Sequence, residues 1–425
     1  MFKMKKRQRN ILGTTATLAE KYGNAIFSAA ILFLLGAGFV YAFARGYNLH
    51  FPDERQYFAI AGNLASGKGF SLDGTSPTAL FPPLYPLLIA ALLKLGASIP
   101  VVRCVNYLIL CGSLLTIRSI LRHEGAEDAR GISAFLFIAY GVLFYTAGTL
   151  YPQTLFTLVL LLLVRCALEK NAGTPAMLLF GILCAVLMLV HSTGVFIPPV
   201  AGLWMILVSP DRKKTFMKVA ASALVAVACL SIWTTRNYLV FHRFIPLTTH
   251  GGDTLYIGNN PHTSLDAWYD YVNDAFYQEA SQLPETEQNR YYLKKTIRFW
   301  TTHPADAAIL YLRKLLEYFN YYNNLFVGRE FDSLKKVIMF ITYYPLLLCL
   351  VIRLLMAGRV PLTDGEKLLV AVYIASAFFH ALFIPRIRFR LPYDALLIAH
   401  IGIMYHIFTC RMRGPGEASA ISAGT

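Results

Sequence analysis

The chain has 425 residues, of which 56% are hydrophobic and 15% are charged, and its mean hydropathy is +0.50. A soluble domain carries about 25% charged residues, so this composition excludes a soluble enzyme, and it excludes a disordered chain as well. The apolar residues form many runs that are long enough to cross the ~30 Å hydrocarbon core of a bilayer as helices. The net charge is +15, but the basic residues lie mostly in short segments between these runs. That is the positive-inside pattern of membrane proteins. The sequence therefore predicts an all-α polytopic membrane protein with no nucleic-acid partner.

The apolar runs predict about ten transmembrane helices. The first run, at about 25–43, follows a basic N-terminal segment and has no signal-peptide cleavage site, so we interpret it as a retained membrane helix. The other spans are expected near 100–118, 131–148, 153–169, 175–191, 194–209, 217–234, 334–352, 367–385 and 391–409. With ten spans and both termini inside, the Lys and Arg clusters between the runs all fall on the cytoplasmic side.

This topology divides the chain into five regions. They are a cytoplasmic N-terminus at 1–24, a transmembrane region at 25–234 that includes a catalytic first periplasmic loop at 45–98, a periplasmic helical region at 235–333, a second transmembrane region at 334–410 and a cytoplasmic tail at 411–425. In the first loop, the apolar segment 81–94 is too short to cross the bilayer and suits an interfacial helix. In the periplasmic helical region, Ile309, Leu312 and Leu316 predict a helix that packs an apolar stripe on the membrane domain, with Lys314 off that stripe.

Two adjacent carboxylates, Asp53 and Glu54, follow closely after the first span. Apolar residues continue from Tyr57 at helical spacing, so we expect Asp53 to be the N-cap of a short helix, a role worth about 1 kcal/mol. The functional alternative is a general base held at a helix start beside the bilayer. Both interpretations stay open on this feature alone.

Common catalytic and metal-binding signatures are absent from the sequence. The seven cysteines are Cys104, Cys111, Cys166, Cys184, Cys229, Cys349 and Cys410. All lie in or at the ends of apolar runs, which fits neither a disulfide framework nor a zinc site. We therefore expect no cofactor and no metal site, and the sequence leaves assistance by a divalent ion open. His191 ends a predicted span, where a histidine is either an interfacial hydrogen-bonding residue or a catalyst.

Three arginines, Arg386, Arg388 and Arg390, alternate with apolar residues before the last span, on the side where the positive-inside rule disfavours them. One interpretation is that their charged ends reach the lipid headgroups. The other is a clamp for a phosphate, which guanidinium groups bind with two charge-assisted bonds. In an extended segment, all three side chains would project from the same side.

Taken together, these segments resemble the integral-membrane glycosyltransferases of the C superfamily. They are similar above all to the family 39 branch, the bacterial relatives of protein O-mannosyltransferases and of the lipid A aminoarabinose transferase. The matching motifs are Asp53-Glu54 with Tyr57 and Gly67-Lys68-Gly69, then Pro82-Pro83-Leu84-Tyr85-Pro86, Thr235-Arg236-Asn237-Tyr238 and Arg388-Phe389-Arg390-Leu391-Pro392.

The resemblance implies an inverting glycosyltransferase that moves a sugar from a polyprenyl-phosphate carrier, such as undecaprenyl phosphate, to an acceptor hydroxyl. The acceptor is a lipid, a glycan or a protein, at the periplasmic face of the bacterial inner membrane. Asp53 would be the catalytic base, Glu54 would orient the acceptor or tune Asp53, and arginines would hold the carrier phosphate. The implied substrate-binding residues are Tyr57, Lys68, Pro83, Tyr85, Gln153, His191, Arg236, Asn237, Arg386, Arg388 and Arg390.

The chain departs from the family pattern at three positions that bear on substrate choice. Gln153 stands where many relatives have an acid, Phe81 where the aminoarabinose transferase has a lysine, and His191 where an arginine is frequent. A competing hypothesis is a transporter or flippase of a lipid-linked sugar, although transporters tend to place ionisable residues at the bilayer midplane. A third is a structural subunit of an envelope-polymer complex.

Overall fold

The computed structural model describes residues 2–169, 173–263, 265, 275–322 and 333–413. These residues form helices joined by turns, with one isolated β-bridge between Ser71 and Pro77. The N-terminal half contains α1 (Phe2–Arg45), α2 (Pro52–Ala65), α3 (Leu84–Lys94), α4 (Ile99–His123), η1 (Glu127–Ala129), α5 (Arg130–Ala139), α6 (Gly141–Ala147), α7 (Gln153–Ala167), α8 (Thr174–Val190), η2 (Ser192–Phe196) and α9 (Ile197–Val208). The rest contains α10 (Arg212–Phe241), α11 (Gly251–Ile257), α12 (Ala275–Ser281), α13 (Glu285–Thr302), α14 (Pro304–Glu317), α15 (Ser333–Leu355), α16 (Asp364–His380) and α17 (Ile387–Arg413).

Within the described residues, five helices are long and apolar enough to cross a membrane. They are Tyr22–Arg45, Ile99–His123, Arg212–Phe241, Leu334–Leu355 and Ile387–Met412. The pair Glu127–Ala139 and Gly141–Ala147, bent by 63°, makes a sixth if it is one broken span. Each of these coincides with a predicted span, so the chain is an all-helical, multi-pass membrane protein.

The remaining four predicted spans fall on shorter helices. They are α7, α8, the joined segment Ser192–Val208 and α16, which have 15 to 17 residues each. At ~1.5 Å per residue such helices are about 23–26 Å long, which is less than the hydrocarbon thickness. The number of ten spans therefore stays a prediction.

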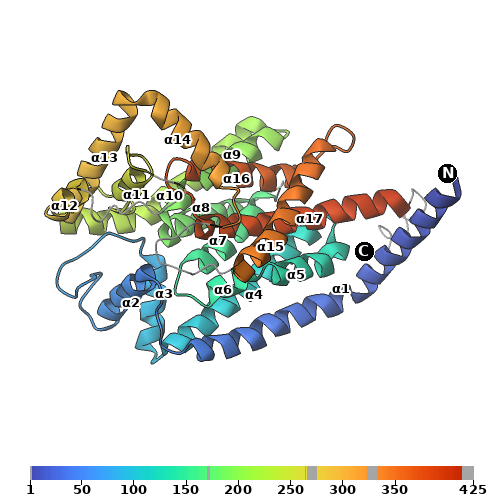
Figure 1. The fold of residues 1–425 in the computed structure, drawn as a ribbon, viewed down its shortest axis with the longest axis horizontal. Coiled ribbons are helices and arrows are strands. Elements are labelled where there is room, and N and C mark those ends of the chain that lie inside the picture. The colour runs from blue at the N-terminus through green and yellow to red at the C-terminus, as the bar shows by residue number, and fades with distance from the viewer. Residues whose placement is uncertain (1, 170–172, 264, 266–274, 323–332, 414–425) are drawn as a thin grey trace.

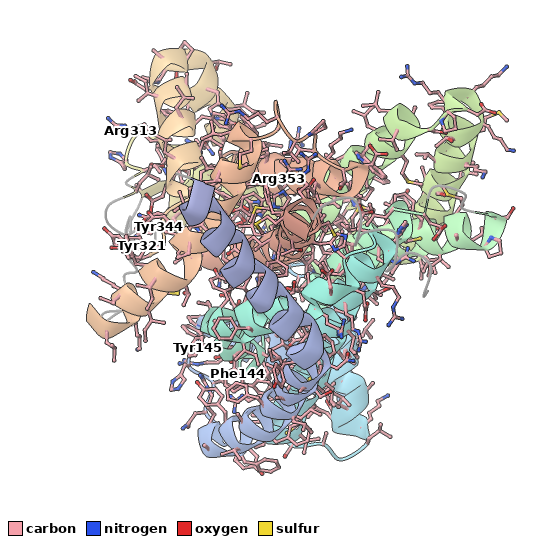
Figure 2. All side chains as sticks on the ribbon, turned by 90° about the vertical axis from the view of Figure 1, so that its right-hand side faces the viewer. Phe144, Tyr145, Arg313, Tyr321, Tyr344 and Arg353 are labelled. Atoms are coloured by element: carbon pink, nitrogen blue, oxygen red, sulfur yellow. The ribbon has the colours of Figure 1, made fainter. Side chains whose placement is uncertain are left out.

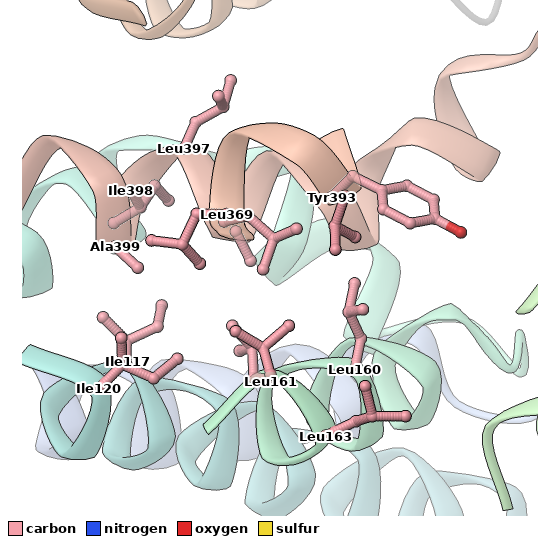
Figure 3. Close-up of a cluster of buried hydrophobic side chains, with 14 of the residues drawn as sticks. Ile117, Ile120, Leu160, Leu161, Leu163, Leu369, Tyr393, Leu397, Ile398 and Ala399 are labelled. Atoms are coloured by element: carbon pink, nitrogen blue, oxygen red, sulfur yellow. The ribbon is translucent and has the colours of Figure 1, made fainter. Parts of the chain in front are cut away.

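The main core forms around α17. All residues from 391 to 400 are buried, as expected of a helix that is surrounded by other helices. Figure 3 shows Leu397, Ile398 and Ala399 of this helix above side chains of α4 and α7. α17 thus connects the first and last parts of the sequence.

The two ends of the molecule differ in what they contain. In Figure 1 the N-terminus of α1 and the C-terminal end of α17 lie at the right, whereas α2, α3, α11, α12 and α13 gather at the left. The helical parts of the two predicted periplasmic segments are therefore neighbours in space. A second hydrophobic cluster holds α2 and α3 at this end, with Tyr57, Ile60 and Tyr85 packed near Leu150 and Trp233.

The predicted orientation of α14 is wrong. Ile309, Leu312 and Leu316 are 51%, 58% and 75% exposed, whereas Lys314 is fully buried. The Lys314 amine donates to the carbonyl of Gly258 and to Oδ1 of Asn259, both at 2.8 Å, and to the carbonyl of Leu382 at 3.3 Å. Three polar atoms thus decide which face packs inward, and Figure 2 shows the adjacent Arg313 at the outer edge of the molecule.

Candidate functional site

Asp53 lies at the start of α2, but it does not cap the helix. The helix begins at Pro52, so Phe51 is the N-cap residue and Asp53 occupies the second helical position. The capping bonds come from Glu54, whose Oε2 accepts the backbone N–H groups of His50 and Phe51, each at 3.0 Å. The expected N-cap role of Asp53 is therefore wrong, because the helix starts at Pro52, two residues earlier than expected. Asp53 therefore has no N-cap role in α2.

Glu54 also connects α2 to a distant segment. Its side chain is fully buried, and its Oε1 accepts the backbone N–H of Leu150 at 2.8 Å. Three backbone donors thus hold this carboxylate, which fixes the start of α2 against the turn before α7. A part in catalysis stays a prediction for Glu54, and its contacts are those of a positioning residue.

Asp53 forms an ion pair with Arg388, which is 335 positions later in the chain. Nη1 of Arg388 donates to Oδ2 of Asp53 at 2.7 Å and to the hydroxyl of Tyr151 at 3.1 Å. The guanidinium also lies over the rings of Tyr151 and Phe389, at 5.3 and 5.0 Å from their centroids. Both charged side chains are about one third exposed. A carboxylate and an arginine therefore meet at one accessible point.

The three arginines do not line one wall. The segment is helical from Ile387 onward rather than extended, and two residues along a helix turn a side chain by about 200°. Arg390 therefore points into the protein, where its Nε donates to Asp394 at 3.1 Å and its Nη1 to the carbonyl of Tyr318 at 2.7 Å. Arg386 lies half-buried in the turn before α17. The prediction of a common wall is wrong because the helix starts earlier than expected.

Aromatic residues of the first loop form one side of the site. Tyr57 is buried, and its ring centroid lies 4.4 Å from that of Phe81 and 5.6 Å from that of Tyr85. Burial and the Asp53 carboxylate raise the pKa of Tyr57 well above its ordinary value, so its hydroxyl stays protonated. Pro83 directly precedes α3 and is buried. The Tyr85 hydroxyl accepts from the Asn106 amide at 3.2 Å.

His191 lies beside the residue that follows Arg388, with its ring centroid 5.8 Å from that of Phe389. Its Nδ1 accepts the backbone N–H of Thr193 at 3.3 Å. A ring nitrogen that accepts carries no proton, so the neutral ring keeps its hydrogen on Nε2. His191 therefore offers the site an uncharged donor. Gln153 is buried at the start of α7, and its Oε1 has no hydrogen-bond partner among the described residues.

The structure does not bring three predicted residues to Asp53. Lys68 is exposed in the turn after α2. Arg236 donates to the carbonyls of Thr78 and Phe70, at 2.8 and 3.2 Å, and to the side chain of Asn237. Asn237 in turn donates to the carbonyl of Ile245 at 3.0 Å. Arg236 thus attaches the first loop to the end of α10, whereas Asn237 holds the segment that follows α10.

Two residues near Asp53 were missed from the sequence. Tyr151 contacts Arg388 directly, and its place between a predicted outside turn and a span gave no chemical signal. His250 has its ring 5.9 Å from that of Phe81 and its Nδ1 2.9 Å from Oδ2 of Asp253. Burial works to lower the pKa of His250, but the Asp253 carboxylate outweighs it and raises that pKa. The sequence signal that could have identified His250 is the acid three residues later, Asp253.

A metal centre is not evident in the described ranges, where no three His, Cys, Asp or Glu side chains converge. The site therefore consists of one carboxylate, one accessible guanidinium, a neutral histidine and aromatic walls. Such a set can accept a proton and hold an anion at adjacent positions.

Comparison with known proteins gives a likeness in fold. No protein-family model matches the chain, and no curated protein matches it. Among solved structures, ArnT from Cupriavidus metallidurans bound to undecaprenyl phosphate is 13% identical, with a TM-score of 0.43 over 89% of this chain and 77% of that chain. The chain resembles ArnT in fold. The apo ArnT structure is 12% identical, with a TM-score of 0.39 over 88% of this chain and 78% of that chain.

At this identity and TM-score, the likeness to ArnT concerns the course of the chain alone. It carries no information about the substrate or the site residues of this protein.

Proposed function

We propose that this protein transfers a sugar from a polyprenyl-phosphate carrier, such as undecaprenyl phosphate, to an acceptor hydroxyl at the periplasmic face of the bacterial inner membrane. The observation that supports this proposal is the contact of Asp53 with Arg388 at an accessible point beside the membrane-spanning helices. A reaction of this kind needs a base for the acceptor and a cation for the carrier phosphate, and these two residues offer both.

In the proposed reaction, the acceptor oxygen attacks the anomeric carbon, and the bond from that carbon to the carrier phosphate breaks. Asp53 takes the hydroxyl proton, as a positioned carboxylate does in general-base catalysis. The departing phosphate keeps the electron pair of the broken bond, and Arg388 stabilises its charge. A single displacement of this kind inverts the anomeric centre, by analogy with inverting glycosidases.

The neutral His191 and the aromatic side chains of Tyr57, Phe81 and Tyr85 suit the sugar and the acceptor. An uncharged N–H donor bonds a sugar hydroxyl without competing with Arg388 for the phosphate. Glu54 and Arg236 would act indirectly, by holding α2 and the first loop in place.

The test is transfer by the purified protein, supplied with radiolabelled polyprenyl-phosphate sugars and candidate acceptors. Asp53→Asn should reduce turnover by roughly 10²–10⁴, the range for losing a positioned base. Because Asp53 has no capping role, the substitution should leave α2 intact. Asp73→Asn is the matched control: Asp73 lies in the same loop, where it accepts from Ser71, Thr75 and Ser76. Full turnover in Asp53→Asn would refute the assignment of the base.

A further inference from the structure

The two groups that the proposed reaction needs are bound to each other. Oδ2 of Asp53 accepts from Nη1 of Arg388 at 2.7 Å, so this oxygen is held against the arginine rather than against an acceptor hydroxyl. The same contact occupies a donor of Arg388 that would otherwise face an anion. In this arrangement the two side chains engage each other rather than a substrate.

The contact between them is one that an anion could displace. It is a single-point ion pair, whereas a phosphate accepts two parallel N–H bonds from a guanidinium. Nε of Arg388 is buried and has no hydrogen-bond partner within the described part of the chain. An incoming phosphate would therefore gain a donor that Asp53 leaves unused.

The surroundings allow the pair to separate without unfolding the site. Glu54, not Asp53, satisfies the start of α2, through His50 and Phe51. The guanidinium also lies over the rings of Tyr151 and Phe389, contacts that do not involve Asp53. Asp53 can thus leave Arg388 while α2 and the arginine both keep their positions.

We propose that the Asp53–Arg388 ion pair keeps the base inactive until the carrier phosphate binds. The phosphate takes Arg388, and the released Asp53 becomes free to accept the acceptor proton. Donor binding would then precede acceptor activation, which protects the site from deprotonating a hydroxyl that has no sugar to attack. This inference rests on the proposed function, because it assumes a phosphate-bearing donor.

The proposal predicts that removing the catalytic carboxylate strengthens donor binding. Binding of undecaprenyl phosphate to the purified full-length protein in nanodiscs is measured for the wild type and for Asp53→Asn. We expect the dissociation constant to fall about three- to tenfold, since breaking the pair no longer opposes binding and tenfold corresponds to about 1.4 kcal/mol. Asp73→Asn, which removes a carboxylate of the same loop, should leave it unchanged.

A double-mutant cycle distinguishes competition for Arg388 from general charge repulsion. Asp53→Asn is also made in an Arg388→Gln protein, where we expect no gain in affinity. An equal gain with and without Arg388 would show simple repulsion and overturn the inference, as would unchanged affinity in Asp53→Asn. If no variant binds undecaprenyl phosphate, the proposed donor class is wrong, and the inference is overturned together with it.

Discussion

Arg388 and Arg390 are separated by one residue and serve opposite sides of α17. Arg388 reaches Asp53 of the first loop at 2.7 Å. Arg390 is buried and contacts Asp394, and its guanidinium lies 3.5 Å from the centroid of the Tyr343 ring. Asp394 also accepts from the Tyr140 hydroxyl at 2.6 Å. One arginine thus faces the site, and the other joins helices behind it.

The two arginines should respond differently to substitution. Arg388→Lys keeps the charge but loses the paired N–H donors, so undecaprenyl phosphate should bind about tenfold or more weakly while thermal stability in detergent stays near normal. Arg390→Gln leaves a buried carboxylate without its cation, a change that costs about 3–5 kcal/mol, and should lower the unfolding temperature strongly. Equal binding defects in two stably folded variants would contradict this division of roles.

Glu285 should be important for the position of the first loop. At the start of α13, its carboxylate accepts from the Thr78 hydroxyl at 2.7 Å and from the Ala79 N–H at 2.9 Å, and it also accepts from Thr249 beside His250. Glu285→Gln removes a charged acceptor from these bonds, and each bond to a charged group is worth about 1.5–3 kcal/mol. We expect a clear loss of thermal stability in detergent.

The control for Glu285 lies two residues further along the same helix. Glu287 is half exposed and 3.6 Å from Arg243, a surface pair worth at most about 1 kcal/mol. Glu287→Gln should therefore be nearly neutral. If the two variants were equally stable, the contacts of Glu285 would not hold the loop.

Lys314 should make stability depend on pH. Burial lowers the pKa of its amine from 10.5 to about 7. Between these values the unfolded chain binds a proton that the folded chain has lost, so the free energy of unfolding should rise as the pH rises through this interval. Unfolding measured between about pH 7 and 10 checks this slope.

Lys314→Met separates this slope from the loss of hydrogen bonds. The variant leaves the acceptors of Gly258, Asn259 and Leu382 without the amine, so it should be less stable at every pH. Its stability should nevertheless rise less with pH than that of the wild type. An identical rise in both proteins would assign the effect to other groups.

The predicted topology can be tested with single cysteines in a background without the seven native ones. Gln282→Cys, between α12 and α13, should react with an impermeant maleimide from the periplasmic side. Gly358→Cys, between α15 and α16, should react from the cytoplasmic side. Both positions are exposed, and a side chain at Gly358 meets open space. Reaction from the same side would overturn the ten-span arrangement.

A cysteine at Gly258 would be unsuitable for this test. A Cβ atom there would lie 2.6 Å from the carbonyl carbon of Phe383, closer than two such atoms can approach. This glycine lets the segment before α12 pack directly on the turn between α16 and α17. Labelling at this position would therefore report disruption of the fold together with sidedness.

The sequence by itself determined the class of protein and the positions of most helices. Apolar run length and helical periodicity are local properties, so they identified the long helices and also α2, α3 and α14. The placement of Asp53 near the start of α2 followed from the same local pattern. The local pattern did not identify the residue whose side chain caps α2. The choice between Asp53 and Glu54 depended on Pro52, which shifts the helix start.

Only the tertiary structure decided what these residues contact. Asp53 meets Arg388 because the buried helix α17 brings the last part of the chain beside the first loop, and no local pattern encodes a contact across 335 positions. Arg388 and Arg390 have opposite orientations because α17 begins at Ile387. The alternation of arginine and apolar residues did not indicate this helix start. Lys314 turned inward because three oxygen atoms from distant segments met its amine. Partner choice is set by packing between helices, whereas helix formation is set within each helix.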